Sequence, residues 1–171
     1  MIARSLDVYV WLKLCLDNGG KTYADLGQEL GMSASEVHAA VRRGGEAGVV
    51  KPGSRRVIAA ALVEYLLHGV RYAFPAVAGR VARGMPTGFA APCLAGEFAE
   101  TELPAVWEHA EGTVRGQRVE PLHPSAPEAS LRDEDFYRVL ALVDAVRGGR
   151  ARERSAAGTR LRKLLLRDAD D

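Results

Sequence analysis

The sequence predicts a mainly α-helical protein with one small β-hairpin, followed by a mixed segment rich in proline and glycine and then by further helices. Three observations support this fold class. Apolar residues recur at helical spacing near both ends of the chain. Two hydroxyl residues near the N-terminus are each followed three positions later by an acidic residue, as at capped helix starts. Seven of the eight prolines lie between Pro75 and Pro127, which disfavours helix there.

The N-terminal part is expected to form three helices, over residues 5–17, 22–30 and 34–47. Asn18-Gly19-Gly20 should end the first helix and Gly31 the second, because glycine readily adopts the left-handed conformation of a helix C-terminus. The tight turn at Gly31 would then join two short helices, with the first helix packed behind them. This order predicts a helix-turn-helix.

The second and third helices are expected to pack through their apolar positions. In the second helix these are Ala24, Leu26, Leu30 and Tyr23. In the third helix they are Val37, Ala40, Val41 and Gly44. The opposite face of the third helix carries Ser35, His38, Ala39, Arg42 and Glu46, with Arg43 at its flank. The third helix is thus expected to expose a polar face.

Residues 49–58 are expected to form a small hairpin, because β-branched pairs flank the turn sequence Pro52-Gly53-Ser54. Three cations lie at or near its tip: Lys51, Arg55 and Arg56. A further helix should follow over 59–68 and end at His68-Gly69. A helix-turn-helix followed by a basic hairpin is the arrangement of a winged helix, which we assign to residues 1–70.

This arrangement predicts binding to double-stranded DNA. The second helix of the pair would enter the major groove, where Arg42 can donate two hydrogen bonds to guanine. Ser33 and the amides at the helix start can hold a phosphate, and the basic hairpin can reach a neighbouring phosphate strand or the minor groove. The predicted DNA-binding residues are Ser33, Ser35, His38, Ala39, Arg42, Arg43, Lys51, Arg55 and Arg56. The alternative is that Arg42 and Arg43 form a solvated face and the hairpin is an ordinary connection.

Four stretches resemble winged-helix transcriptional regulators of the MarR-like kind: Tyr23-Ala24-Asp25-Leu26-Gly27, Leu30-Gly31-Met32-Ser33, Ser35-Glu36-Val37 and Ala47-Gly48-Val49-Val50. The chain from His68 onward resembles a bacterial group that carries an N-terminal winged helix. The resemblance implies a sequence-specific, double-stranded DNA-binding protein that regulates transcription in a prokaryote. Because a two-fold dimer would place two recognition helices about 34 Å apart on one face of DNA, we expect a homodimer.

Residues 71–171 are expected to serve dimerisation or partner binding. An extended segment over 71–128 would contain short strands such as 113–115 and 119–120, while the glycines of 79–88 suggest a surface loop. Helices should return over 129–167, broken at Gly148-Gly149. Their apolar positions are Phe136, Val139, Leu140, Val143 and Val146, followed by Leu161, Leu164 and Leu165 beside several arginines.

The net charge is only +1, but it is unevenly distributed: residues 1–96 carry +4, residues 97–137 carry −7 and residues 138–171 carry +4. DNA binding depends on the local potential of the contacting face, so a neutral total is compatible with it. The acidic centre also supports an alternative, a protein-interaction module such as an antitoxin-like partner of an enzyme that represses its own operon. The arginine-rich end could instead add DNA affinity or pair with the acidic segment of a second copy.

Enzymatic chemistry has little support in the sequence, although an enzyme acting on nucleic acid is a third hypothesis. The acidic residues Glu97, Glu100, Glu102, Glu108 and Glu111 have no metal-ligand spacing and are expected to form a solvated face. No cofactor or metal motif accompanies His109, His123 or Ser125. No apolar run reaches membrane-spanning length, so a cytoplasmic protein is expected, with Cys15 and Cys93 as reduced thiols.

Overall fold

A computed structural model describes residues 3–166 and has a mostly helical fold with three short strands, which confirms the predicted helical class. The N-terminal helices are α1 (Ser5–Asp17), α2 (Tyr23–Leu30), α3 (Ala34–Glu46), α4 (Ala59–His68) and α5 (Val70–Ala73). The middle of the chain forms β1 (Ala78–Pro86), the 3₁₀ turns η1 (Gly88–Ala90) and η2 (Pro92–Leu94), β2 (Ala105–Glu108) and β3 (Val114–Val119). The last helices are α6 (Ala126–Arg132), α7 (Glu134–Gly148) and α8 (Ala151–Leu165).

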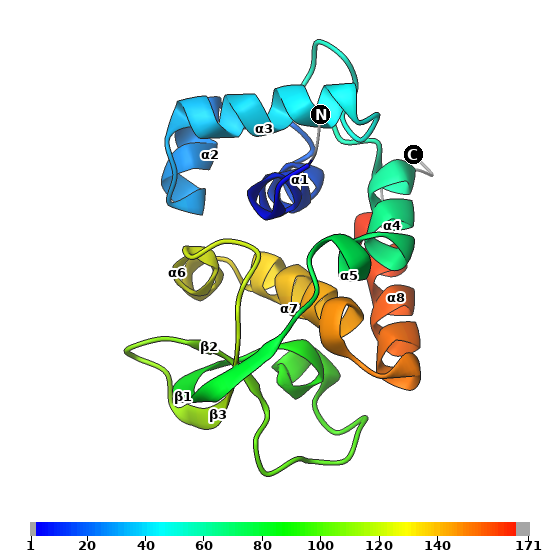
Figure 1. The fold of residues 1–171 in the computed structure, drawn as a ribbon. Helices are drawn as coiled ribbons and strands as arrows, with labels where there is room; N and C mark the ends of the chain where they lie inside the picture. The colour runs from blue at the N-terminus through cyan, green and yellow to red at the C-terminus, as the bar shows by residue number, and fades with distance from the viewer. Residues whose placement is uncertain (1–2, 167–171) are drawn as a thin grey trace.

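Helix α1 lies at the centre of the molecule, between the α2–α3 pair on one side and α6 and α7 on the other (Figure 1). It is buried without interruption from Asp7 to Leu14, whereas a helix on the surface would bury only one stripe. The indole Nε1 of Trp11 donates a hydrogen bond of 2.9 Å to the Ala40 carbonyl of α3. Helix α1 is therefore the support on which the α2–α3 pair rests.

The three strands form a small mixed sheet in which each strand pairs with the other two. Strand β1 is antiparallel to β2 and β3, which run parallel to each other. The two short strands expected at 113–115 and 119–120 are one continuous strand, and β1 occupies most of the stretch 79–88, for which a surface loop was suggested. Glycine permits the close pairing, since a Cβ on Gly84 would overlap the backbone of Trp107.

The C-terminal helices follow the predicted apolar pattern with one difference. The expected stripe of α7 is buried: Phe136, Val139, Leu140, Val143 and Val146. Asp133 separates α6 from α7 and caps the latter, accepting a hydrogen bond of 3.0 Å from the Phe136 amide. The predicted break at Gly148-Gly149 lies between α7 and α8. Arg167, the last residue of the predicted helix, lies outside the described residues.

One hydrophobic core includes residues from both the N-terminal and the C-terminal helices. A buried lysine crosses the junction between them: Lys13 Nζ of α1 lies 2.8 Å from Glu29 of α2 and 2.5 Å from Asp133 at the start of α7. Burying the ammonium between two carboxylates compensates for its lost hydration. This arrangement links α2 of the helix-turn-helix to the C-terminal helices through side chains.

A second buried polar cluster holds the sheet against α7. The Asp144 carboxylate accepts hydrogen bonds from Thr87 Oγ1 and Trp107 Nε1, both at 2.7 Å, and from Arg147 at 2.6 Å. Arg147 also donates to the Phe74 carbonyl at 2.7 Å. Burial raises the pKa of Asp144, an effect that the Arg147 charge and the three hydrogen bonds oppose. These contacts fasten β2 and the segments directly before and after β1 to one helix.

Candidate nucleic-acid interface

Two capping boxes and one left-handed glycine shape the α2–α3 pair. Thr22 Oγ1 accepts from the Asp25 amide at 3.1 Å, and Ser33 Oγ accepts from the Glu36 amide at 3.2 Å. Between the two helices Gly31 has φ of 70°, a conformation that favours glycine. The helix-turn-helix boundaries therefore follow from local sequence signals.

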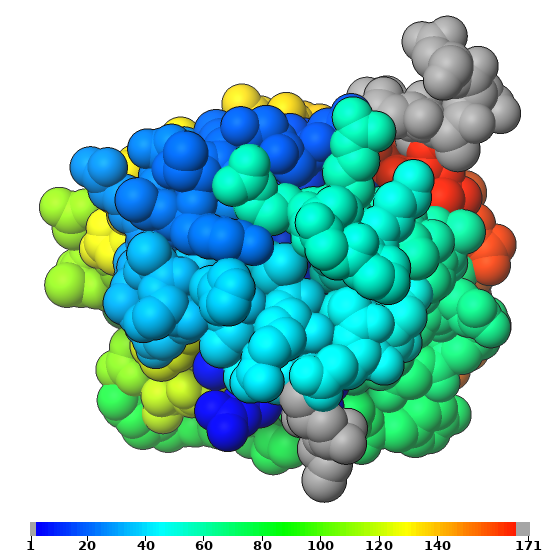
Figure 2. All heavy atoms as spheres, turned by 90° about the horizontal axis from the view of Figure 1, so that it is seen from above, coloured from blue at the N-terminus to red at the C-terminus, as the bar shows by residue number. Residues whose placement is uncertain are grey.

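Helix α3 lies on the molecular surface with its polar face uncovered. Figure 2 shows it in cyan across the face seen from above, beside the blue-green residues of the 50–58 hairpin. Ser33, Ser35, His38 and Arg42 are exposed and Ala39 is half-buried, which places five of the predicted residues on this face. Arg42 has no carboxylate partner among residues 3–166, so its guanidinium is available to a ligand.

The start of α3 already holds an anion of its own. Glu36 Oε2 accepts from the Ser33 amide at 2.9 Å and from Ser33 Oγ at 2.8 Å. These hydrogen bonds lower the pKa of Glu36 and keep it charged. A phosphate that bound the Ser33 amide or hydroxyl would have to displace the Glu36 carboxylate, so Ser33 serves first as a helix cap.

Arg43 corrects the sequence-based list of DNA-binding residues, because its side chain points into the protein. Its Nε lies 2.8 and 3.0 Å from the two carboxylate oxygens of Asp7, and its NH2 group lies 2.6 Å from one of them. Asp7 is fully buried and Arg43 is 9% exposed. The hydrogen bonds to Asp7 raise the pKa of Arg43, which stays charged. Arg43 therefore binds α3 to α1 and is not available to DNA.

The hairpin is short and held mainly by its backbone. Val50 and Val57 form one isolated β-bridge, and the Lys51 amide donates to the Arg56 carbonyl at 2.9 Å. Gly53 at the tip has φ of 70°, as a tight turn requires. Lys51 and Arg56 are exposed and lack carboxylate partners within residues 3–166. Two of the three predicted wing cations are thus free on the surface beside α3.

The third wing cation, Arg55, is half-buried and lies over an aromatic ring. Its guanidinium carbon is 5.3 Å from the ring centroid of Tyr23, the first residue of α2. The same ring meets the imidazole of His38 edge-on, with centroids 5.2 Å apart and an interplanar angle of 81°. Tyr23 is half-buried against the core, as expected from the sequence, and its ring also lies between Arg55 of the hairpin and His38 of α3. Helical periodicity alone does not predict the contact with Arg55, because only the folded hairpin brings Arg55 to the Tyr23 ring.

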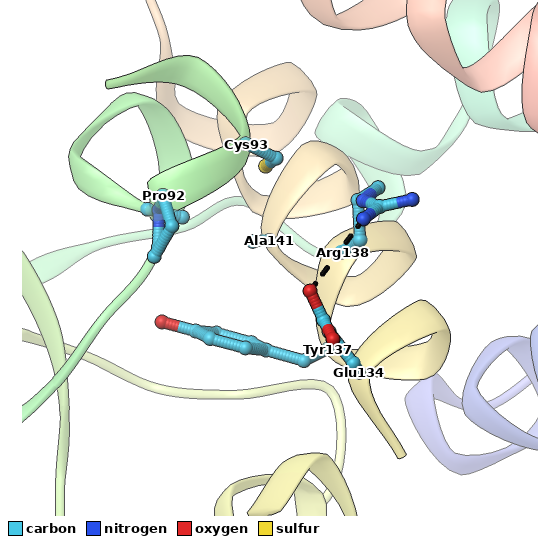
Figure 3. A pocket seen from close by; sticks show the side chains of 7 residues that line it. Pro92, Cys93, Glu134, Tyr137, Arg138 and Ala141 are labelled. Atoms are coloured by element: carbon cyan, nitrogen blue, oxygen red, sulfur yellow. Dashed lines mark ion pairs between the residues drawn. The ribbon is translucent and has the colours of Figure 1, made fainter. Parts of the chain in front are cut away.

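A cavity of about 390 Å³ lies between η2 and α7 (Figure 3). Burial raises the pKa of the Cys93 thiol that lines it, which keeps the sulfur protonated and poorly nucleophilic. Tyr137 donates its hydroxyl to the Pro86 carbonyl at 2.5 Å, and Arg138 pairs with Glu134 at 3.7 Å. Among the polar groups that line this cavity, Arg138 pairs with Glu134 and the Tyr137 hydroxyl is bound to a backbone carbonyl outside the lining, so they form no nucleophile–base pair.

The five acidic residues between positions 97 and 111 all lie on the surface, as expected for a solvated face. Glu97 pairs with Arg160, and Glu108 lies 2.5 Å from Arg80 and 3.3 Å from Arg118. Glu100, Glu102 and Glu111 are exposed. Residues 3–166 contain no group of three metal-ligating side chains. None of the helices in this part of the chain has both the length and the apolar character that a membrane crossing requires.

Comparison with known proteins yields no relative for this chain. No protein-family model matches it. Neither the curated proteins nor the solved structures contain a match.

Proposed function

We propose that this chain is a winged-helix protein that binds double-stranded DNA in a sequence-specific manner and regulates transcription in a prokaryote, acting as a homodimer. In this proposal α3 enters the major groove and presents Ser35, His38 and Arg42 to the base edges. The hairpin is the wing, and its cations contact the phosphate backbone.

One observation carries the proposal: α3 and the 50–58 hairpin lie on the same face of the molecule (Figure 2), and both expose polar or cationic side chains. Arg42 lacks an intramolecular partner among residues 3–166, as do Lys51 and Arg56. The helix behind them is fixed by the buried Asp7–Arg43 pair. A rigid, accessible helix flanked by free cations is what groove binding requires.

Fluorescence anisotropy with labelled duplex tests the proposal, using the DNA upstream of the chain's own gene and a scrambled duplex. Arg42→Ala should weaken binding to the preferred duplex about tenfold and leave binding to the scrambled one nearly unchanged. The double variant Lys51→Ala/Arg56→Ala should weaken binding to both and reduce the salt slope by about 2.

Arg152→Ala is the matched control, because Arg152 is an exposed arginine of α8 without a carboxylate partner in the described chain. It should bind like the wild type. Equal affinity of the wild type for both duplexes would contradict sequence-specific reading. Equal losses in Arg152→Ala and the hairpin variant would contradict a localised DNA-binding face.

The second candidate is a protein-interaction module, such as an antitoxin-like partner that also controls its own operon. Exposed apolar side chains favour it: Tyr72 is 75% exposed, Val77 69% and Val81 40%, all within one short stretch. Contiguous exposed apolar side chains are typical of protein-binding surfaces. Co-purification of a genomic neighbour that survives high salt and nuclease treatment would support this function, and a duplex-dependent complex would argue against it.

A further inference from the structure

We infer that Tyr23 is a positioning residue that couples the wing to the recognition helix, so that Arg55 and His38 contact DNA as one unit. This inference rests on the proposed DNA-binding function and specifies how its two parts cooperate.

Tyr23 has a neighbour from each part of the interface. The Arg55 guanidinium carbon lies 5.3 Å from the centre of its ring, and the His38 imidazole meets that ring edge-on at 5.2 Å. The two groups are therefore no more than about 10.5 Å apart, the sum of the two distances. This separation is below the ~12 Å width of the major groove. With His38 in the groove, Arg55 can reach a phosphate at its edge.

The ring is the main restraint on the Arg55 side chain. Within residues 3–166 Arg55 makes no ion pair, and the hairpin that carries it has a single β-bridge. The backbone of the hairpin packs near Gly19, because a Cβ built on Gly19 would lie 3.3 Å from the Arg55 carbonyl oxygen. The backbone of the hairpin is thus placed by the α1–α2 turn, whereas the guanidinium is placed by Tyr23 through a cation–π contact.

An ordered guanidinium binds more tightly than a freely rotating one, because less conformational freedom is lost when the complex forms. Removing the ring should therefore lower affinity even though no charge changes. The effect of deleting Arg55 should also shrink once the ring is gone. Such non-additivity is expected for residues that act through one another and is absent for independent contacts.

The test is a double-mutant cycle of Tyr23→Ala and Arg55→Ala, measured by anisotropy on the duplex from upstream of the gene. Tyr23→Ala should weaken binding about two- to fivefold, and Arg55→Ala should cost at least twofold less in the Tyr23→Ala background than alone. Tyr23→Phe keeps the aromatic face and should bind within about twofold of the wild type. Melting curves of each free variant confirm that it is folded.

The Arg71–Tyr72 pair supplies the matched control, because Arg71 lies over the Tyr72 ring at 5.0 Å in an exposed part of the chain away from α3. Tyr72→Ala should leave DNA affinity unchanged. If Tyr23→Ala does not fold, Tyr23→Leu removes the π-face while retaining an apolar side chain, and the same cycle applies.

Additive losses in the cycle would overturn the inference, as would a loss in Tyr23→Phe equal to that in Tyr23→Ala. Either result leaves the proposed function intact, provided that Arg42→Ala still weakens binding. A wild-type chain that binds no duplex would refute the proposed function and this inference with it.

Discussion

Replacement by alanine should have different effects at the adjacent residues Arg42 and Arg43, lowering DNA affinity at the first and protein stability at the second. Arg42 projects from the exposed face of α3, whereas Arg43 forms a bidentate ion pair with the fully buried Asp7. Arg43→Ala should therefore destabilise the protein, because it leaves the Asp7 carboxylate buried without its partner. Arg42→Ala should leave stability almost unchanged and lower only DNA affinity.

The size of the effect follows from the burial of the pair. Breaking a buried ion pair by removing one partner costs about 3–5 kcal/mol, and the 9% exposure of Arg43 favours the lower end. In a chain of 171 residues each kcal/mol lowers the melting temperature by about 2–4 °C. Arg43→Ala should thus melt about 6–12 °C below the wild type, and Arg42→Ala within about 2 °C of it.

Thermal unfolding followed by circular dichroism measures both variants under the same conditions. An apolar replacement of both partners, Asp7→Leu/Arg43→Met, should recover part of the lost stability, since it leaves no unpaired buried charge. If Arg43→Ala melted together with Arg42→Ala, the buried pair would not have the structural role described, and Arg43 would return to the candidate DNA contacts.

Three further predictions concern the scaffold. Gly27→Ala should lower the free energy of unfolding, measured by urea titration, by about 1–3 kcal/mol. The reason is that a Cβ at Gly27 would lie 2.6 Å from the Met32 carbonyl oxygen. Unchanged stability would mean that α2 and α3 can move apart without cost. Asp144→Asn should destabilise by about 3 kcal/mol, since an amide cannot balance the Arg147 charge; a gain in stability would contradict a stabilising role for the Asp144–Arg147 pair. Burial raises the pKa values of Glu29 and Asp133, but hydrogen bonds from Lys13 outweigh it and lower them from the ordinary 4.5 and 3.8. The stability that these two ionised carboxylates contribute to the fold is therefore present above the ordinary pKa values and is lost as pH falls through the lowered pKa values. Lys13→Met should reduce this acid-dependent part, while the share due to Lys21 and the Phe136 amide remains; an unchanged pH profile of unfolding would contradict the assignment.

The helices near the N-terminus could be predicted because their boundaries are set by neighbouring residues. The pairs Thr22–Asp25 and Ser33–Glu36 are each three residues apart, and both form the expected capping boxes. The helices expected over 5–17 and 59–68 also have the predicted bounds. Such signals act within one turn of helix, so the helix boundaries that they set do not depend on the tertiary contacts of the rest of the chain.

The sequence does not predict which arginine side chains are buried and which are exposed, because their burial depends on residues distant in sequence. Asp7, 36 positions before Arg43, decides that this arginine is buried. Tyr23 and Arg55 meet only after the hairpin has folded back on α2. Strand β1 was missed for a related reason: its N-terminal half is exposed and lacks a buried-and-exposed alternation, and it is held by pairing to β3.

Chemical-shift mapping of the backbone amides during titration with the upstream duplex tests the central claim most directly. If α3 reads DNA and the hairpin contacts its backbone, the shifts should gather at residues 33–42 and 51–56, and the amides of α8 and the three strands should be unaffected. Shifts concentrated in 72–81, or spread evenly over the chain, would contradict the account.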